Sequence, residues 1–317
     1  MTVNTDSAMT LGSLDLSNAP LALGGNVFGW TSDRADSFAV LDGFVGGGGV
    51  LIDTADSYSA WVPGHSGGES ETMIGEWLAA RGRRDDVLIA TKVSQHPEFT
   101  GLAAANVRAA AEASLRRLGV DTIDLYYAHF DHGDPIEETA EAFSALVDDG
   151  LVREIAISNL TAERIDAWMA VADAEGLHEP VALQPHYNLM ERTFEGDLRD
   201  AATRHGLGVL PYWGLAKGFL TGKYREADGA VDSPRASQAL AYLDDRGRRV
   251  LSALDRVAIE HEADVAAVAL AWLKAQPTVV APIASARNAA QLETLLASMR
   301  LELNPSDLQA LTEASAL

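Results

Sequence analysis

The sequence predicts an α/β fold, a single-domain (β/α)8 barrel of the TIM type over residues 1–317. Eight short apolar runs recur along the chain, with helical patterns between them and no interdomain linker. Runs that are apolar on both faces are typical of parallel strands covered by helices, and eight strand–helix units in this length fit a closed barrel. The alternative is a doubly wound open sheet. That fold usually carries a GxGxxG turn after its first strand, and the early segment LGGNVFG has a different spacing.

Each predicted strand is a short run of apolar or β-favouring residues. In chain order they are LALGG from Leu21, VLID from Val50, VLIATK from Val87, IDLYYAH from Ile123, EIAIS from Glu154, VALQ from Val181, GVLPY from Gly208 and VVAPI from Val279. In a parallel barrel the carboxyl ends of the strands meet at one face, which is where active sites of this fold lie. Polar residues that close an apolar run are therefore the ones to examine.

Helical patterns with recognisable ends follow several of these strands. The segment DPIEETAEAFSALVDDG predicts a helix with Asp134 as its N-cap and Pro135 in its first position. Glu137 would complete a capping box, and Gly150 would end the helix. Two more patterns at helical spacing are Val107, Ala111, Leu115 and Leu118 before Gly119, and Ile165, Trp168, Met169 and Ala172 before Gly176. READGAVDSPRAS, from Arg225 to Ser237, predicts a long exposed loop between the seventh strand and a long helix.

The composition excludes several classes of protein. The chain is 47% hydrophobic, which is enough to bury a full core. Its apolar runs are all shorter than the ~20 residues of a membrane-spanning helix. The amino-terminal segment lacks the basic and apolar regions of a signal peptide, so we expect a cytoplasmic protein. The absence of cysteine rules out disulfides, thiol nucleophiles and thiolate zinc sites.

The charge is strongly acidic. Against 46 Asp and Glu the chain has 24 Lys and Arg, a formal net charge of -22. Such a field repels polyanions, so neither nucleic acid nor an anionic membrane surface is expected as a partner. An anionic small ligand would need a locally basic pocket. Lysine occurs only at Lys92, Lys217, Lys223 and Lys274.

Polar side chains that are not interchangeable stand at the ends of most predicted strands. They are Asp53, Lys92, His129, Ser158, Asn159, Gln184, Tyr212, Ser285 and Arg287. Each alone has a structural explanation, since an Asp after a strand often caps a helix and a His or Tyr is often part of a core. Together, at the face where a barrel has its active site, they indicate a functional site.

An acid, a lysine, a phenol and an imidazole can share proton-transfer chemistry. A phenol has an ordinary pKa of ~10, so it needs a nearby cation to exchange protons near neutral pH. Lys92 can supply that cation to Tyr58, which lies five residues beyond Asp53. A lysine buried at a strand end needs a carboxylate partner, and Asp53 on the preceding strand is placed to provide one. His129 can then orient a carbonyl oxygen by a hydrogen bond.

The segment HFDH keeps a different class of enzyme open. His129, Asp131 and His132 could serve as metal ligands in a barrel hydrolase or isomerase. That hypothesis leaves Lys92 and Tyr58 without a role. The interpretation preferred here therefore contains no metal.

Several ordered motifs resemble those of the aldo-keto reductases, including bacterial and channel-associated members, over nearly the whole chain. They are IDTADSY with GGESETMIGEWL, IATKV, IDLYYAHFDHGDPIEET, GLVREIAISNL, LQPHYNLMER and LPYWGLAKGFLTGKY. The resemblance implies an oxidoreductase that reduces an aldehyde or ketone to an alcohol by hydride transfer. It implies NADPH as the cofactor, bound without a Rossmann fold, and a small-molecule carbonyl substrate as the partner.

The resemblance also implies roles for individual residues. The catalytic tetrad is Asp53, Tyr58, Lys92 and His129, with Tyr58 as the general acid. Ser158, Asn159 and Gln184 would hold the nicotinamide carboxamide, and Tyr212 would stack on the ring. The rest of the implied cofactor site is Gly214, Leu215, Lys217, Gly218, Ser285, Arg287 and Gln291. Among these, Arg287 favours NADPH over NADH because it stands at a helix start suited to a phosphate.

Some positions depart from the family pattern. Gly214 replaces a proline that is common after the stacking aromatic, and Thr294 with Leu295 replaces a Glu-Asn pair that often binds adenine. The residues expected in the substrate pocket are Phe28, Trp30, Trp61 and Phe130. An aromatic cleft of this kind is compatible with sugars, small aldehydes and hydrophobic ketones. A second hypothesis within the resemblance is a sensor or regulatory protein that binds NADPH with negligible turnover.

Overall fold

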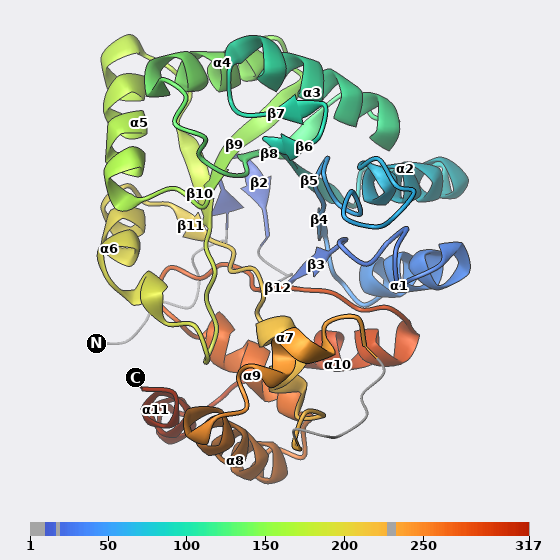
Figure 1. The fold of residues 1–317 in the computed structure, drawn as a ribbon, viewed down its shortest axis with the longest axis vertical. Coiled ribbons are helices and arrows are strands. Elements are labelled where there is room, and N and C mark those ends of the chain that lie inside the picture. Colours follow the sequence, from blue (N-terminus) through green and yellow to red (C-terminus); the bar gives the residue numbers. More distant parts are fainter. Residues whose placement is uncertain (1–9, 17–19, 227–232, 317) are drawn as a thin grey trace.

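The fold is a barrel of eight parallel strands surrounded by helices, seen in a computed structural model that describes residues 10–16, 20–226 and 233–316 (Figure 1). The barrel strands are β3 (Ala22–Gly24), β4 (Leu51–Asp53), β5 (Leu88–Val93), β8 (Ile123–Ala128), β9 (Val152–Ser158), β10 (Pro180–Gln184), β11 (Gly208–Val209) and β12 (Ile283–Ala284). Their spatial order is β11-β10-β9-β8-β5-β4-β3-β12, and every neighbouring pair is parallel. The (β/α)8 prediction is confirmed and the open-sheet alternative is wrong.

The barrel closes through the segment that precedes β12. Val209 N donates to Thr278 O at 2.9 Å, Val280 N donates to Val209 O at 2.9 Å, and Ile283 N donates to Pro211 O at 2.8 Å. The predicted strand VVAPI from Val279 is therefore divided. Its first part lies along β11, and Ile283–Ala284 pairs with β3.

Helices alternate with the strands and cover the outside of the barrel (Figure 1). They are α1 (Arg34–Gly46), α2 (Glu69–Arg81), α3 (Ala104–Leu118), α4 (Ile136–Asp148), α5 (Ala162–Glu175), α6 (Asp197–Arg204), α7 (Ala236–Leu240), α8 (Asp245–Glu260), α9 (Val265–Lys274), α10 (Ala289–Arg300) and α11 (Pro305–Ala314), with short 3-10 helices at Thr193–Glu195 and Ala216–Thr221. The described part of the chain contains no helix long and apolar enough to span a membrane. Part of the predicted 225–237 loop, residues 227–232, lies outside the described residues. The prediction of one domain over residues 1–317 also includes undescribed residues and stays a prediction.

The predicted helix ends are partly correct. Helices α3 and α5 end before Gly119 and Gly176, both left-handed, as their patterns predict. The prediction of a capping box at the start of α4 is wrong, because the helix begins at Ile136 without a side-chain cap. Asp134 instead accepts a hydrogen bond from Leu102 N at 2.8 Å, next to the start of α3. A tertiary contact thus takes the side chain that the local pattern assigns to the cap.

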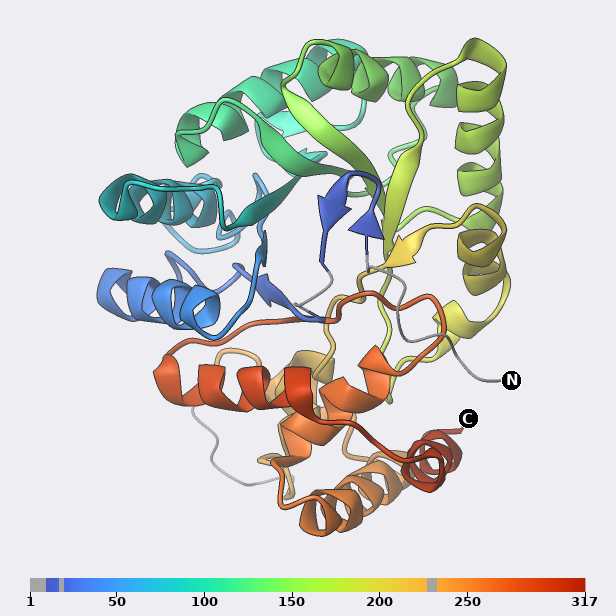
Figure 2. The same ribbon diagram turned by 180° about the vertical axis from the view of Figure 1, so that it is seen from behind.

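An amino-terminal hairpin, which the strand prediction did not include, closes the barrel on the side away from the pocket described below (Figure 2). Strands β1 (Thr10–Leu11) and β2 (Leu14–Asp15) are antiparallel and joined by a two-residue loop whose first residue, Gly12, has φ +56°. Glycine in that position is a hairpin signal. Leu11 and Leu14 are buried against the inward-facing barrel residues, so the hairpin completes the core at this end.

Candidate active site

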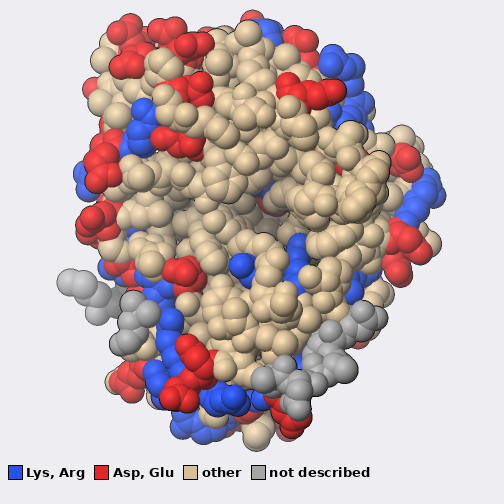
Figure 3. Space-filling view, in the orientation of Figure 1, with Lys and Arg blue, Asp and Glu red and all other residues tan. Residues whose placement is uncertain are grey.

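A cavity of about 950 Å³ opens where the barrel strands end, and it appears as the hollow near the centre of Figure 3. Most residues predicted for the site lie on its wall. These are Trp30, Asp53, Tyr58, Trp61, His129, Phe130, Asn159, Gln184, Tyr212, Gly214, Leu215, Lys217, Gly218, Ser285, Arg287 and Gln291. Lys92 and Ser158 are fully buried just behind the wall. The parallel strands bring these residues together from positions far apart in the sequence.

Lys92 is the centre of a buried polar cluster. It lies near the end of β5, and its ammonium donates to Asp53 Oδ2 at 2.7 Å, to Thr54 O at 2.6 Å and to Tyr58 OH at 3.2 Å. Gln184 Nε2 donates to the other Asp53 oxygen at 2.9 Å. Asp53 and Lys92 are each no more than 2% exposed, so the ion pair is shielded from water. The acid, the lysine and the phenol that the sequence groups together are therefore in contact.

Burial sets the proton affinities of this cluster. It raises the pKa of Tyr58, and the nearby Lys92 ammonium opposes that rise only in part. Burial also works against the charge on Lys92, but Asp53 and Tyr58 together outweigh it and raise the pKa of Lys92 overall. At neutral pH the site therefore holds a charged lysine beside a protonated phenol.

His129 stands beside Tyr58 at the end of β8. The two ring centroids are 6.3 Å apart. Burial and the positive charge of Lys92 together hold the pKa of His129 well below its usual value, so the imidazole is neutral. Its Nδ1 atom is buried without a hydrogen-bond partner in the described residues. His129 lines the cavity, and a neutral imidazole at this wall is suited to form a hydrogen bond with a ligand.

A group of amide and hydroxyl side chains lines the adjoining wall. Tyr212 OH donates to Asn159 Oδ1 at 2.8 Å, while Asn159 Nδ2 donates to His129 O at 2.9 Å. Ser158 Oγ donates to Gln184 O at 2.8 Å and accepts from Asn159, which explains why Ser158 lies behind the wall. Asn159 has a positive φ of 53°, a conformation that asparagine tolerates better than most residues. The network fixes Asn159 and Tyr212 rigidly relative to His129.

The segment after Tyr212 turns sharply around one end of the cavity. Trp213, Ala216 and Lys217 have positive φ values of 57°, 46° and 58°, and Gly218 has φ 98°. The turn is closed by backbone hydrogen bonds from Ala216 N to Trp213 O at 2.7 Å and from Gly218 N to Leu215 O at 2.9 Å. The Lys217 ammonium lies 5.6 Å from the centroid of the Trp213 ring.

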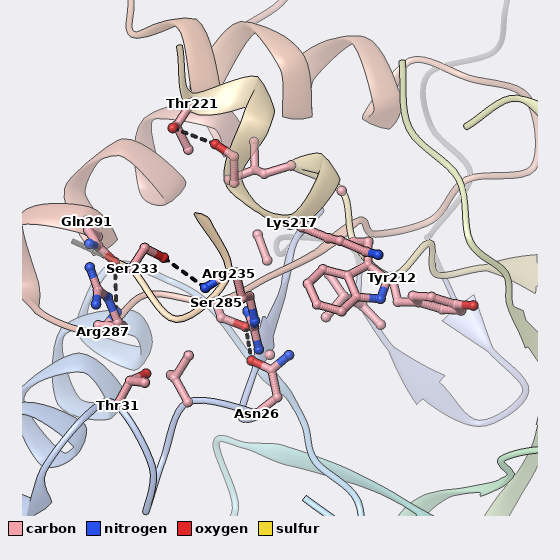
Figure 4. Close-up of a pocket in the computed structure, with 18 of the residues that line it drawn as sticks. Asn26, Thr31, Tyr212, Lys217, Thr221, Ser233, Arg235, Ser285, Arg287 and Gln291 are labelled. Carbon is pink, nitrogen blue, oxygen red and sulfur yellow. Dashed lines mark hydrogen bonds between the residues drawn. The ribbon is translucent and has the colours of Figure 1, made fainter. Parts of the chain in front are cut away.

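The opposite end of the cavity carries more polar groups (Figure 4). Gln291, near the start of α10, accepts a hydrogen bond from Arg287 N at 3.0 Å through its side-chain oxygen. Ser285 Oγ donates to Asn26 Oδ1 at 2.9 Å. Arg287 makes no side-chain hydrogen bond or ion pair with the residues that the structure describes. Its guanidinium is thus available to a ligand.

Sequence reasoning missed Arg235, which lies between these two ends (Figure 4). Its guanidinium stacks between two indoles, 5.2 Å from the Trp30 centroid and 4.7 Å from the Trp213 centroid. Burial lowers the pKa of Arg235, yet a guanidinium keeps its charge in proteins. The residue belongs to the segment predicted only as an exposed loop, and nothing local in DSPRAS signals a place in the cavity. Asn26 and Trp213 were missed as well.

An aromatic wall adjoins Tyr58. Trp61 meets Trp30 edge to face with centroids 5.5 Å apart, and lies 6.3 Å from Tyr58. Trp61 is 52% exposed and Phe130 is 39% exposed, so both present apolar surface at the cavity mouth. The prediction that Phe28 belongs to the substrate pocket is wrong. Its side chain is fully buried among core residues and does not line the cavity, because the chain turns there and carries Trp30 to the wall instead.

The possible metal ligands of HFDH have separate partners. Asp131 pairs with Arg164 at 2.8 Å, and His132 lies 2.7 Å from Gln95 Nε2. Across residues 10–16, 20–226 and 233–316 the structure contains no group of three His, Asp or Glu side chains that could hold a metal ion. The side chains of HFDH therefore do not converge on one point.

Known proteins resemble this chain over most of its length. The model of the Aldo/keto reductase family matches residues 20–316. Protein tas of Escherichia coli (strain K12) is 31% identical over 320 residues, covering 92% of each chain. Aldo-keto reductase YhdN of Bacillus subtilis (strain 168) is 33% identical over 295 residues, which is 90% of this chain and 85% of the relative. Norsolorinic acid reductase of Aspergillus flavus is 29% identical over 314 residues, or 93% of this chain and 77% of the relative.

Proposed function

Because this chain belongs to the aldo/keto reductase family, we propose that it is an oxidoreductase that reduces an aldehyde or ketone to an alcohol with NADPH, using Tyr58 as the general acid. The observation that carries the proposal is the contact of a paired, buried ammonium with a phenol at the cavity wall. Lys92 lies 3.2 Å from Tyr58 OH and 2.7 Å from Asp53. A protonated phenol in that place can give its proton to an alkoxide oxygen as charge develops on it.

The residues of the cavity fit a phosphorylated dinucleotide. Arg235, Arg287 and Lys217 line it without a carboxylate partner among the described residues, although the chain as a whole has a net charge of -22. A locally basic cavity in an acidic protein suits an anionic ligand. When bound, NADPH supplies the hydride that adds to the carbonyl carbon. Asn159 and Gln184 would hold its carboxamide, and Tyr212 would stack on its ring.

The other proposed cofactor contacts lie at the two ends of the cavity, one end for the pyrophosphate and the other for the adenosine phosphate. Gly214, Leu215, Lys217 and Gly218 would surround the pyrophosphate at the end of the cavity where the chain turns sharply, with the Lys217 ammonium as the cation there. Ser285, Arg287 and Gln291 would hold the adenosine phosphate at the other end. Arg235, between the two, would add a second guanidinium for the phosphates.

The remaining residues act on the proton and on the carbonyl oxygen. When Tyr58 gives up its proton it becomes a phenolate, which the Lys92 ammonium stabilises. Asp53 keeps Lys92 charged. The neutral imidazole of His129 orients the carbonyl oxygen by a hydrogen bond. Trp30, Trp61 and Phe130 form the apolar wall against which the rest of a small-molecule substrate packs.

A substrate panel tests the proposal directly. The purified protein is mixed with aldehydes and ketones of graded size in the presence of NADPH or NADH, and loss of reduced-nicotinamide absorbance is followed; alcohols with NADP+ test the reverse direction. We expect turnover with at least one carbonyl and a preference for NADPH. Tight NADPH binding, seen by fluorescence, with negligible turnover on every compound would favour the sensor hypothesis instead.

The pH dependence of reduction follows from the raised pKa of Tyr58. The acid form of the phenol is needed for reduction, and it is fully present below this pKa and lost as pH rises through it. We expect kcat/KM for reduction to stay level through neutral pH and to fall only at about pH 10 or above. Initial rates measured across that range check this. A fall centred near pH 7 would mean that some group other than Tyr58 gives the proton.

Arg287→Ala should weaken the binding of NADPH and leave the binding of NADH nearly unchanged. Alanine keeps the backbone N–H that donates to the Gln291 side-chain oxygen, and it removes the guanidinium. A charged hydrogen bond contributes about 1.5 to 3 kcal/mol, so the Kd for NADPH should rise roughly 10- to 100-fold. The Kd for NADH, which lacks the phosphate, should change little. Fluorescence titration of both cofactors measures this, and equal weakening of both would remove Arg287 from the phosphate site.

A further inference from the structure

A second phenol lies beside the Lys92 ammonium, on the side of the cluster away from the cavity. Tyr127 is on β8 directly opposite Lys92 in the strand register, and its side chain is fully buried. Its ring centroid is 5.5 Å from Lys92 Nζ, and the Tyr58 ring centroid is 5.0 Å from the same atom. The ammonium thus lies within cation–π distance of two aromatic rings.

The hydrogen-bonding capacity of Lys92 is already used by other groups. An ammonium has three N–H donors, and these reach Asp53, Thr54 O and Tyr58. Tyr127 is therefore not needed as an acceptor. What it adds is the negative face of a ring in an environment without water, where cation–π attraction is strongest.

The hydroxyl of Tyr127 does not explain why the residue is there. The atom is buried, and the only side chain that interacts with it in the described part of the chain is the Gln184 amide, which is not aligned for a regular hydrogen bond. Burial, followed by the charge of Asp53, raises the pKa of Tyr127 well above its usual value, and the Gln184 amide opposes that rise only in part, so the group stays a neutral phenol. A buried hydroxyl without a well-aligned hydrogen bond is unfavourable by itself. The ring is the part of Tyr127 that interacts with the cluster.

We propose that Tyr127 is a positioning residue whose ring stabilises the charged form of Lys92 and holds the ammonium under Tyr58. The titratable groups that face Lys92 are Asp53 from β4, Tyr58 from the following loop, and Tyr127 and His129 from β8, with Asp56 farther off. Of these, Tyr127 alone is a ring that neither lines the cavity nor bonds to Lys92. Its effect on catalysis rests on the proposed function, but its effect on Lys92 does not.

The chain offers a direct measurement, because it contains only four lysines. Protein labelled with 13C at lysine Cε gives four resonances, and replacing Lys217, Lys223 and Lys274 by arginine in turn leaves Lys92 as the remaining signal. The signal is titrated to alkaline pH in the parent, in Tyr127→Phe and in Tyr127→Leu. The phenylalanine variant keeps the ring and removes only the hydroxyl, so it is the matched control.

We expect Tyr127→Phe to titrate like the parent and Tyr127→Leu to lower the midpoint pH of Lys92 by about 0.5 to 1.5. The sign follows because an interaction with the cation favours the charged form, and its loss lets the proton leave at lower pH. A leucine variant with the parent midpoint would overturn the proposal. So would a phenylalanine variant that shifts as far as leucine, since the hydroxyl would then be responsible. If the leucine variant does not fold, Tyr127→Met removes the ring with an unbranched side chain and is judged by the same midpoint.

The kinetic readout separates positioning from substrate binding. In Tyr127→Leu we expect kcat to fall roughly 2- to 30-fold with little change in KM, and the alkaline fall of kcat/KM to begin at lower pH. Tyr127→Phe should match the parent in both. A parent protein without reductase activity, but with the expected NMR midpoints, would contradict the proposed function and leave this inference standing.

Discussion

Tyr58→Phe should lower kcat for carbonyl reduction by about 10² to 10⁴ while leaving cofactor affinity nearly unchanged. Phenylalanine keeps the ring that contacts Trp61 and faces the Lys92 ammonium, so only the hydroxyl is lost. Lys92 still has Asp53 and Thr54 O as partners, and the ion pair should persist. The loss is therefore chemical and not structural. Steady-state kinetics and a fluorescence titration with NADPH measure the two quantities.

The matched control is Tyr126→Phe. Tyr126 is on the neighbouring position of β8, is fully buried and also has an unpaired hydroxyl, but its ring packs against Phe143 outside the barrel. Removing that hydroxyl should leave kcat within about twofold of the parent, since it has no partner to lose. If Tyr58→Phe kept more than a tenth of the parent kcat, Tyr58 would not be the proton donor.

Lys92→Met is expected to abolish activity and to lower the free energy of unfolding by about 3 to 5 kcal/mol. Methionine fills most of the lysine volume, but Asp53 is left as a buried carboxylate with Gln184 as its remaining hydrogen-bond donor. An unpaired buried charge is far less favourable than the intact pair. Urea unfolding followed by circular dichroism gives the stability, and the carbonyl assay gives the activity.

A double variant shows whether charge or packing is responsible. Asp53→Asn combined with Lys92→Met removes both charges and keeps similar volumes. We expect it to regain most of the lost stability and none of the activity, because the cation beside Tyr58 is still missing. A double variant as unstable as Lys92→Met alone would mean that the loss comes from packing around the lysine stem.

The prediction of the barrel from sequence succeeded because its signal is local. Strands covered on both faces are apolar throughout, as Leu88–Val93 and Ile123–Ala128 are, and helices α3 and α5 end at glycines that accept a left-handed backbone. The eighth strand was less accurate. Pro282 interrupts its ladder because proline has no N–H group, and the run divides between two neighbours.

The sequence also predicted that the polar residues at the strand ends lie together, but it did not predict several other residues of the cavity. Asp53, Lys92 and Gln184 end parallel strands, and the topology brings strand ends together whatever the details of packing. Arg235 lies on a long connection whose path the local sequence does not specify. Phe28 and Trp30 are two residues apart, and which of them reaches the cavity depends on how the turn after β3 packs.

By itself, the sequence determined the number of strand–helix units, their parallel order and the polar side chains at the strand ends, because hydrophobic period and chain order are properties of the residues alone. Only the tertiary structure decided that the Lys92 ammonium meets Asp53, Tyr58 and the ring of Tyr127, and that burial keeps Tyr58 protonated. Those distances and proton affinities depend on which groups exclude water from one another, and that is fixed when distant segments pack.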